Sequence, residues 1–150
     1  MFPLHHIGFL VADLPAAAAA FVDRFGYVVE SPMIEDPTQT ARVQFLRQPS
    51  AMHWLELIAP NGPQSKLTKA LERGGGFHHL CYEVADLQHA AQKLRQQQML
   101  PLGKSAPATA FSGRLIAWFM DRGNLLVELV EAGPGDLSLD SIRPINTRHQ

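Results

Sequence analysis

The sequence predicts an α+β fold made of two copies of one unit, in which a strand and a helix are followed by three further strands. The segment LHHIGFLVADL at residues 4–14 is written again as FHHLCYEVADL at residues 77–87. The segment HWLELIAP at 53–60 likewise matches NLLVELVE at 124–131 when their glutamates are aligned. Both pairs occur in the same order, and their registers differ by a single residue, so a tandem repeat explains them.

The first unit begins with a strand, because residues 5–11 are apolar and rich in β-formers. Asp13 can cap a helix that has Pro15 in its first turn, and the apolar residues that follow have a helical period. Gly26 suits the end of this helix. Strands are then expected near residues 27–32, 42–47 and 53–58.

The second unit repeats this pattern, with a strand at 77–84 and a helix capped by Asp86 that runs to about Gln98. Three strands are expected near residues 100–104, 115–120 and 125–130. We therefore expect one domain over residues 1–132, followed by a C-terminal tail without periodicity. Its parts are module 1 at about 4–60, a connector at 61–76, module 2 at about 77–132 and the tail at 133–150.

The composition of the 150 residues, 46% hydrophobic and 18% charged, is that of a globular protein. The formal net charge of −1 gives no electrostatic reason to expect a nucleic acid or a membrane surface as partner. No apolar run is long enough to predict a membrane span. The single cysteine, Cys81, excludes an intramolecular disulfide, and a cytoplasmic location is expected.

Four residues at repeat-equivalent strand positions are candidates for metal ligation: His6, Glu56, His79 and Glu128. Both glutamates lie within apolar strands, where a buried carboxylate needs a proton, an ion pair or a metal. If the two units pack about a local twofold axis, equivalent residues converge near that axis. The alternative is that the histidines are structural hydrogen-bonding groups and the glutamates lie at exposed strand edges.

The choice within each pair of histidines depends on the alternation of side chains along a strand. Only one histidine of each pair is then expected to face the shared cavity. His6 shares a face with Gly8, which leaves room for a ligand, whereas His5 shares a face with the bulkier Ile7. This reasoning favours His6 and, by the repeat, His79.

Two imidazoles and two carboxylates form a donor set that suits a divalent metal ion such as Ni²⁺, Co²⁺, Zn²⁺, Mn²⁺ or Fe²⁺. Four protein ligands on an ion that can take six leave positions for substrate oxygens. Such a centre can polarise a carbonyl, and a liganding glutamate that detaches can act as a proton shuttle.

The segments HHIGFLVADL, LELIAP, GGGFHHLCYEVADL and LLVELVE resemble the vicinal oxygen chelate superfamily over about residues 4–132. The likeness is greatest to its methylmalonyl-CoA epimerase and glyoxalase branch. The resemblance implies two tandem βαβββ modules that form a curved, mixed eight-stranded sheet around a metal site, and it implies a homodimer. The ligands that it implies are His6, Glu56, His79 and Glu128.

The resemblance also implies a metal-dependent isomerase or lyase that abstracts a proton next to the carbonyl of a small-molecule substrate and stabilises the enolate. Methylmalonyl-CoA epimerase-like and glyoxalase I-like activities are both open, with Glu56 and Glu128 as catalytic ligands. The sequence departs from the family pattern at Val43, where several bacterial epimerases have a glutamate that serves as a catalytic base. The alternatives are a non-catalytic small-molecule or drug-binding protein of the resistance type, and oxidative ring cleavage. The presence of all four ligands argues against both.

Substrate contacts are expected from Gln44, Trp54 and Arg114. Gln44 lies on the strand ARVQFL, Trp54 shares the face of Glu56, and Arg114 at a strand entrance could pair with a carboxylate or phosphate. Trp118 could also line the cavity. The alternatives are that the tryptophans are ordinary core residues and that Arg114 is a solvated surface residue.

Overall fold

A computed structural model describes residues 2–133 of the chain. The predicted tail, 133–150, lies outside the described residues from position 134 onward. The elements of the first module are β1 (Leu4–Leu10), α1 (Leu14–Phe25), β2 (Val28–Val29), β3 (Ile34–Asp36), β4 (Ala41–Arg47) and β5 (Trp54–Pro60). The connector contains α2 (Thr68–Glu72). The elements of the second module are β6 (Gly76–Val84), α3 (Leu87–Gln96), β7 (Leu100–Pro101), β8 (Ala106–Pro107), the 3-10 helix η1 (Thr109–Phe111), β9 (Leu115–Met120) and β10 (Leu126–Glu131).

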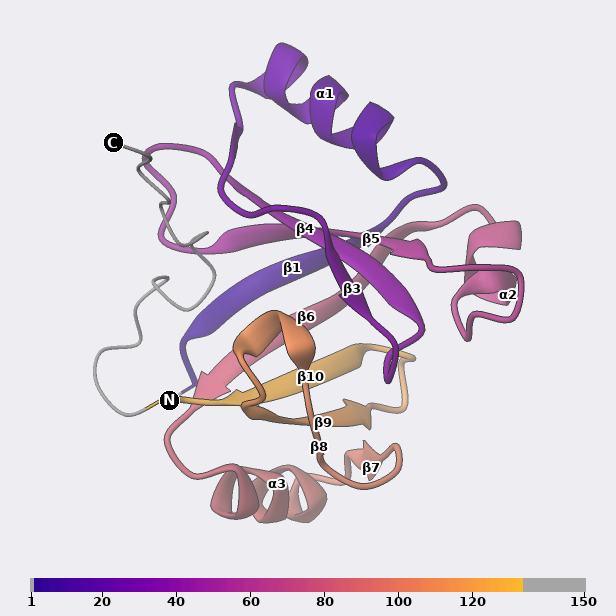
Figure 1. The fold of residues 1–150 in the computed structure, drawn as a ribbon. Helices are drawn as coiled ribbons and strands as arrows, with labels where there is room; N and C mark the ends of the chain where they lie inside the picture. The colour runs from indigo at the N-terminus through magenta and orange to yellow at the C-terminus, as the bar shows by residue number, and fades with distance from the viewer. Residues whose placement is uncertain (1, 134–150) are drawn as a thin grey trace.

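The strands form one mixed sheet whose order follows the internal repeat (Figure 1). Its main path is β2-β4-β5-β1-β6-β10-β9-β7, so the eight predicted strands are all present. β1 pairs in parallel with β5, and β6 pairs in parallel with β10. The two modules join through the antiparallel pairing of β1 with β6. The order of strands on one side of this junction therefore mirrors the order on the other.

The α+β fold of two βαβββ-like modules is confirmed, with two additions that the sequence did not indicate. β3 pairs with β4 and β8 pairs with β9, which makes the sheet ten-stranded. β2 and β7 are also shorter than expected. Pro32 follows β2 and Pro101 lies in β7, and neither residue has the backbone N–H that a longer ladder would need.

The two helices begin at the aspartates that the sequence singled out. The Asp13 carboxylate accepts a hydrogen bond from the Ala16 N–H at 3.0 Å, and the Asp86 carboxylate accepts one from the His89 N–H at 2.9 Å. Gly26 ends α1 in the left-handed conformation at φ 70°, which a residue without a side chain adopts at little cost.

The helices cover the outer face of the sheet, and a second core fills its inner face. On β5, Leu55 and Leu57 pack with Leu14 of α1, while Trp54 and Ile58 point to the opposite side. In the second module, α3 packs in the same way on the outer face of β9 and β10. Because both faces of the central strands are buried, these strands read as nearly continuous apolar runs.

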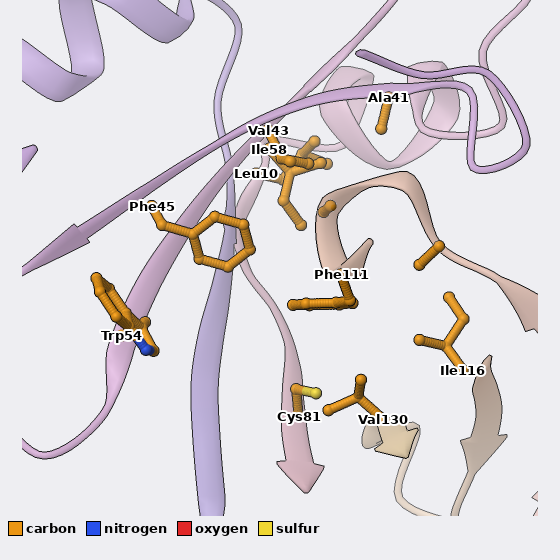
Figure 2. Packing of buried hydrophobic residues seen from close by; sticks show 12 residues of the cluster. Leu10, Ala41, Val43, Phe45, Trp54, Ile58, Cys81, Phe111, Ile116 and Val130 are labelled. Carbon is orange, nitrogen blue, oxygen red and sulfur yellow. The ribbon is translucent and has the colours of Figure 1, made fainter. Parts of the chain in front are cut away.

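The inner core joins side chains from both modules and from η1 (Figure 2). The ring of Phe111 lies between Phe45 of the first module and Val130 of the second. Phe111 is 1% exposed, so η1 closes over the inner face of the sheet. No helix between residues 2 and 133 is long and apolar enough to cross a membrane.

The helix caps give a prediction about stability. Replacing Asp13 or Asp86 by Ala leaves orphan N–H groups at a helix start, so each change is expected to lower the free energy of unfolding by about 1 kcal/mol. Urea denaturation followed by circular dichroism measures this. Asp23→Ala, at an exposed site in the last turn of α1, is the control. A loss no greater than that of the control would contradict the capping role.

Candidate metal centre

The four predicted ligands lie on the four central strands of the sheet, where they are almost wholly shielded from solvent. His6 is on β1, Glu56 on β5, His79 on β6 and Glu128 on β10. Both histidines are 0% exposed, and the glutamates are 5% and 3% exposed. These strands neighbour one another in the order β5-β1-β6-β10, so the β1–β6 junction brings the two halves of the set together.

The ring nitrogens and carboxylate oxygens of this set converge on one point. His6 Nε2 lies 2.9 Å from His79 Nε2, and it lies 3.5 Å from Glu56 Oε2 and 3.4 Å from Glu128 Oε2. His79 Nε2 lies 3.8 Å from Glu56 Oε1 and 3.1 Å from Glu128 Oε2. Each imidazole thus directs the same nitrogen towards both carboxylates.

These separations, from 2.9 to 3.8 Å, are close to those between the ligand atoms of a divalent cation. Nitrogen and oxygen donors at about 2.1 Å from an ion stand roughly 3.0 to 3.4 Å apart when their directions lie between right and tetrahedral angles. Ligand atoms of His6, Glu56 and His79 all lie within 4.8 Å of one another. The donor set, two neutral imidazoles and two carboxylates, also has the chemistry of first-row divalent sites.

The electrostatics of the two glutamates differ. Burial raises the pKa of Glu56 well above its ordinary value, and the negative charges of Glu128 and Asp36 raise it further. Burial also acts to raise the pKa of Glu128, but hydrogen bonds from His6 and His79 outweigh it, and the pKa of Glu128 is lowered. Within residues 2–133, the ion pairs of these two glutamates are all with histidines. A bound cation would therefore relieve the cost of burying two carboxylates side by side.

The side chain of the first histidine in each pair does not point where strand alternation predicts. His5 does not turn away from His6, because a β-bulge at this point of β1 places the two side chains together. His78 and His79 are placed together by a corresponding irregularity on β6. The pKa of His5 is lowered to about 3, mainly by burial and secondly by the nearby His6. The pKa of His78 is lowered to about 4, mainly by burial and secondly by the nearby His79.

Gly8 is required by the position of the His79 ring. A Cβ atom on Gly8 would lie 2.2 Å from His79 Cε1 and 2.3 Å from its Nδ1. No side chain fits at position 8 unless the His79 ring moves. The sequence reasoning named Gly8 for the room that it leaves near His6. The structure shows that the imidazole of the opposite module fills that room.

A cavity of about 360 Å³ leads from the carboxylates to the surface. Its lining includes Glu56, His79 and Glu128, together with Lys66, which is exposed. Most of the remaining lining is apolar: Ala41, Val43, Ile58, Leu67, Leu102, Ala108, Ala110, Phe111, Ile116, Trp118 and Leu126. The cavity therefore offers a polar end at the four ligands and an apolar wall beside it, as small-molecule sites commonly do.

The three residues assigned to substrate contact lie outside the lining of this cavity. Gln44 donates to the Ser31 carbonyl at 3.2 Å, and Trp54 is a core residue, 1% exposed. Arg114 lies 3.4 Å from a carboxylate oxygen of the buried Glu83. Each of these side chains thus has contacts within the fold, and a role for them in substrate binding stays a prediction. Trp118, also considered from the sequence, does line the cavity.

Asp36 and Phe111 are among the lining residues that the sequence reasoning did not name. Asp36 is 3% exposed, and its carboxylate accepts hydrogen bonds from the N–H groups of Gln39 and Thr109. Phe111 reaches the cavity from η1. The Asp-Pro pair at 36–37 signals a turn, but only the contact between β3 and η1 brings both residues to the cavity.

The comparisons with known proteins agree on one family. The family model of the Glyoxalase/Bleomycin resistance protein/Dioxygenase superfamily matches residues 5–118. The chain is 33% identical to the ethylmalonyl-CoA/methylmalonyl-CoA epimerase of Cereibacter sphaeroides, over 84% of this chain and 95% of that protein. It is 30% identical to the mitochondrial methylmalonyl-CoA epimerase of Mus musculus, over 86% of this chain and 72% of that protein.

Solved structures point the same way. Methylmalonyl-CoA epimerase from Mycobacterium tuberculosis matches with a TM-score of 0.77 and 31% identity, over 87% of this chain and 88% of that chain. A variant of the Streptomyces coelicolor methylmalonyl-CoA epimerase, in complex with 2-nitronate-propionyl-CoA, also matches. Its TM-score is 0.76 at 25% identity, over 87% of this chain and 97% of that chain. The chain therefore belongs to the glyoxalase/bleomycin resistance/dioxygenase, or vicinal oxygen chelate, superfamily, and its similarity within that superfamily is to methylmalonyl-CoA epimerases.

Proposed function

We propose that this protein is a metal-dependent epimerase that removes and returns the proton next to the thioester carbonyl of a short branched acyl-CoA. The observation that carries the proposal is the convergence of two imidazoles and two carboxylates at the polar end of the cavity. The similarity to acyl-CoA epimerases favours this reaction over the glyoxalase I-like one.

The metal ligands in this proposal are His6, Glu56, His79 and Glu128. A divalent ion held there would supply Lewis-acid stabilisation of the negative charge that develops on the carbonyl oxygen of the substrate, which is commonly the largest catalytic contribution. The protein's own part is to hold the carbonyl end of the substrate against this centre. The apolar wall formed by residues such as Val43 and Ile116 excludes water from that end.

Glu56 is the better candidate for moving the proton. In the metal-free protein, burial and the charges of Glu128 and Asp36 raise the pKa of Glu56, whereas hydrogen bonds from His6 and His79 lower the pKa of Glu128, so Glu56 is the carboxylate of the two that holds a proton more strongly. In this proposal the Glu56 carboxylate takes the proton from the α-carbon, and the electron pair of the C–H bond moves to the carbonyl oxygen. Return of that proton by Glu56 restores the original configuration, whereas delivery of a solvent-derived proton to the opposite face of the planar carbon gives the other configuration.

The open end of the cavity suits the remainder of the substrate. A space of about 360 Å³ accommodates a small acyl group, so a coenzyme A moiety would extend past the exposed Lys66. The Lys66 ammonium would attract its phosphate groups there. A resistance-type binding protein remains the other candidate class, but it needs no set of four buried donor groups. The homodimer, the cytoplasmic location and the identity of the metal stay predictions from the sequence.

Metal removal gives the first test. Protein purified without a histidine tag and stripped with a chelator is expected to lose turnover. It should regain both turnover and thermal stability when Ni²⁺, Co²⁺, Zn²⁺, Mn²⁺ or Fe²⁺ is added. An ion at 100 times its Kd stabilises the fold by about 2.7 kcal/mol, which a thermal shift measures readily. Unchanged melting across all five ions would refute the metal centre.

Substitution of the two glutamates separates ligation from proton transfer. Glu128→Gln replaces the carboxylate that lies closest to both ligand histidines by a neutral amide, so it is expected to weaken metal binding and to lower turnover together. Glu56→Gln keeps an amide oxygen for the metal but no base, so metal binding should remain while turnover falls by about 10²- to 10⁴-fold. Exchange of the α-proton of methylmalonyl-CoA or ethylmalonyl-CoA in D₂O, followed by NMR, reports turnover directly. Normal exchange in Glu56→Gln would exclude this residue as the base.

The contact between Gly8 and the His79 ring gives a third test. Gly8→Ala forces the imidazole out of the site, so metal affinity should fall sharply in a calorimetric titration. Gly62→Ala is the matched control, because a Cβ atom there meets nothing within 4 Å. Equal affinity in the two variants would show that the ring does not need this position.

A further inference from the structure

Each histidine pair contains one residue that the proposed metal site does not use, namely His5 and His78. His5 is 6% exposed, and its ring meets Phe111 edge-on with 5.3 Å between the ring centres. His78 lies at the wall of the cavity, 6.4 Å from the ring centre of Trp118. The repeat retains both imidazoles, although among the ion pairs of residues 2–133 neither ring pairs with the carboxylate of Glu56 or Glu128.

Both residues lie at irregularities in the pairing of β1 with β6. Leu4 pairs with Tyr82 and His6 with Cys81, so His5 is an extra residue on β1. Bulges of this kind redirect a side chain that regular alternation would send to the other face.

The second irregularity follows the same rule on the other strand. Gly8 pairs with His79 and Phe9 with Phe77, so His78 is an extra residue on β6. The two bulges are therefore related by the repeat. Each one falls immediately before a proposed metal ligand.

The bulges produce the same hydrogen bond twice. His5 Nδ1 lies 2.8 Å from His6 Nδ1, and His78 Nδ1 lies 2.8 Å from His79 Nδ1. The rings within each pair are nearly perpendicular, at 80° and 85°. Two modules that differ in most of their residues therefore keep one contact between the same atoms at the same distance.

The direction of these hydrogen bonds follows from ligation. His6 and His79 direct Nε2 towards the carboxylates, so a metal bound there takes the Nε2 lone pair, and the remaining proton of each ring lies on Nδ1. That Nδ1–H must then donate, and the acceptor within reach is Nδ1 of the preceding histidine. His5 and His78 must accordingly be neutral imidazoles that carry their proton on Nε2.

We propose that His5 and His78 are positioning residues that hold the two ligand imidazoles in the metal-binding tautomer and ring orientation, an inference that rests on the proposed metal site. A histidine ligand whose second nitrogen is held by a hydrogen-bond acceptor is a better donor to the metal, and loss of such a partner typically costs 10- to 100-fold in metal affinity. The double histidine in each copy of the repeat thus supplies one ligand and the group that orients it.

The test compares removal of the acceptor with its replacement. His5→Leu and His78→Leu keep apolar bulk but accept no hydrogen bond, so Zn²⁺ affinity, measured by competition with a chelator, should fall 10- to 100-fold. His5→Asn and His78→Asn place an amide oxygen near the position of Nδ1, and they should recover most of that loss. His89→Leu, at an exposed position of α3, is the control and should bind Zn²⁺ as the unaltered protein does.

A second measurement reads the protons themselves. In Zn²⁺-loaded protein with ¹⁵N-labelled imidazoles, NMR spectra should show His5 and His78 protonated at Nε2 only. A proton on Nδ1 of either ring, or full affinity in both Leu variants, would overturn the proposal. If an Asn variant bound Zn²⁺ as weakly as its Leu counterpart, the histidine would have only a packing role, and this result would also overturn the proposal.

The result also separates this inference from the proposed function. If the unaltered protein binds none of the divalent ions, the metal site and the positioning role both fail. If it binds Zn²⁺ and the Leu variants bind equally well, only the positioning role fails. Thermal melting of each variant in the metal-free state shows whether a lost affinity reflects unfolding.

Discussion

The antiparallel pairing of β1 with β6 is the constraint on which the site depends. It is the seam between the modules, and its register sets Gly8 opposite His79 and His6 opposite Cys81. A slip of one residue would reverse the side-chain faces of one strand relative to the other, so His6 and His79 would lie on opposite faces of the sheet. The strands that flank this pair, β5 and β10, each add one carboxylate, one on either side of the seam. A single register therefore determines whether four donors meet or point apart.

The electrostatic cost of this arrangement lies in the same few residues. Two carboxylates are buried next to each other without a lysine or arginine among their ion-pair partners in the part of the chain that the structure describes. The surroundings act differently on the two groups, since hydrogen bonds from both imidazoles lower the pKa of Glu128, whereas burial and the charges of Glu128 and Asp36 raise the pKa of Glu56. A pair of chemically identical groups thus acquires different proton affinities from its surroundings alone. That difference is what makes distinct roles for the two glutamates physically reasonable.

The repeat made the central part of the fold and the four-donor cluster accessible from sequence, because both follow from local pattern and symmetry. Asp13 and Asp86 could be recognised as caps from their neighbours, and Glu56 and Glu128 from their apolar strands. The bulges at His5 and His78 could not, because regular alternation gives no sign of an extra residue. Asp36 and Phe111 reach the cavity through contacts between segments far apart in the chain. The contact of Arg114 with Glu83 could not be foreseen either, because Glu83 belongs to another strand.

The seam between β1 and β6 joins two modules of one polypeptide, and it has a consequence for how the site behaves on dilution. All four donors and both neighbouring histidines belong to the same chain, linked by the segment that contains α2. A centre built between separate subunits would fall apart as its concentration dropped below the dissociation constant of the pair. Here the covalent connection keeps the second half of the site at a constant, high local concentration near the first. The cluster can therefore assemble in a solitary molecule, whatever larger assembly the protein forms.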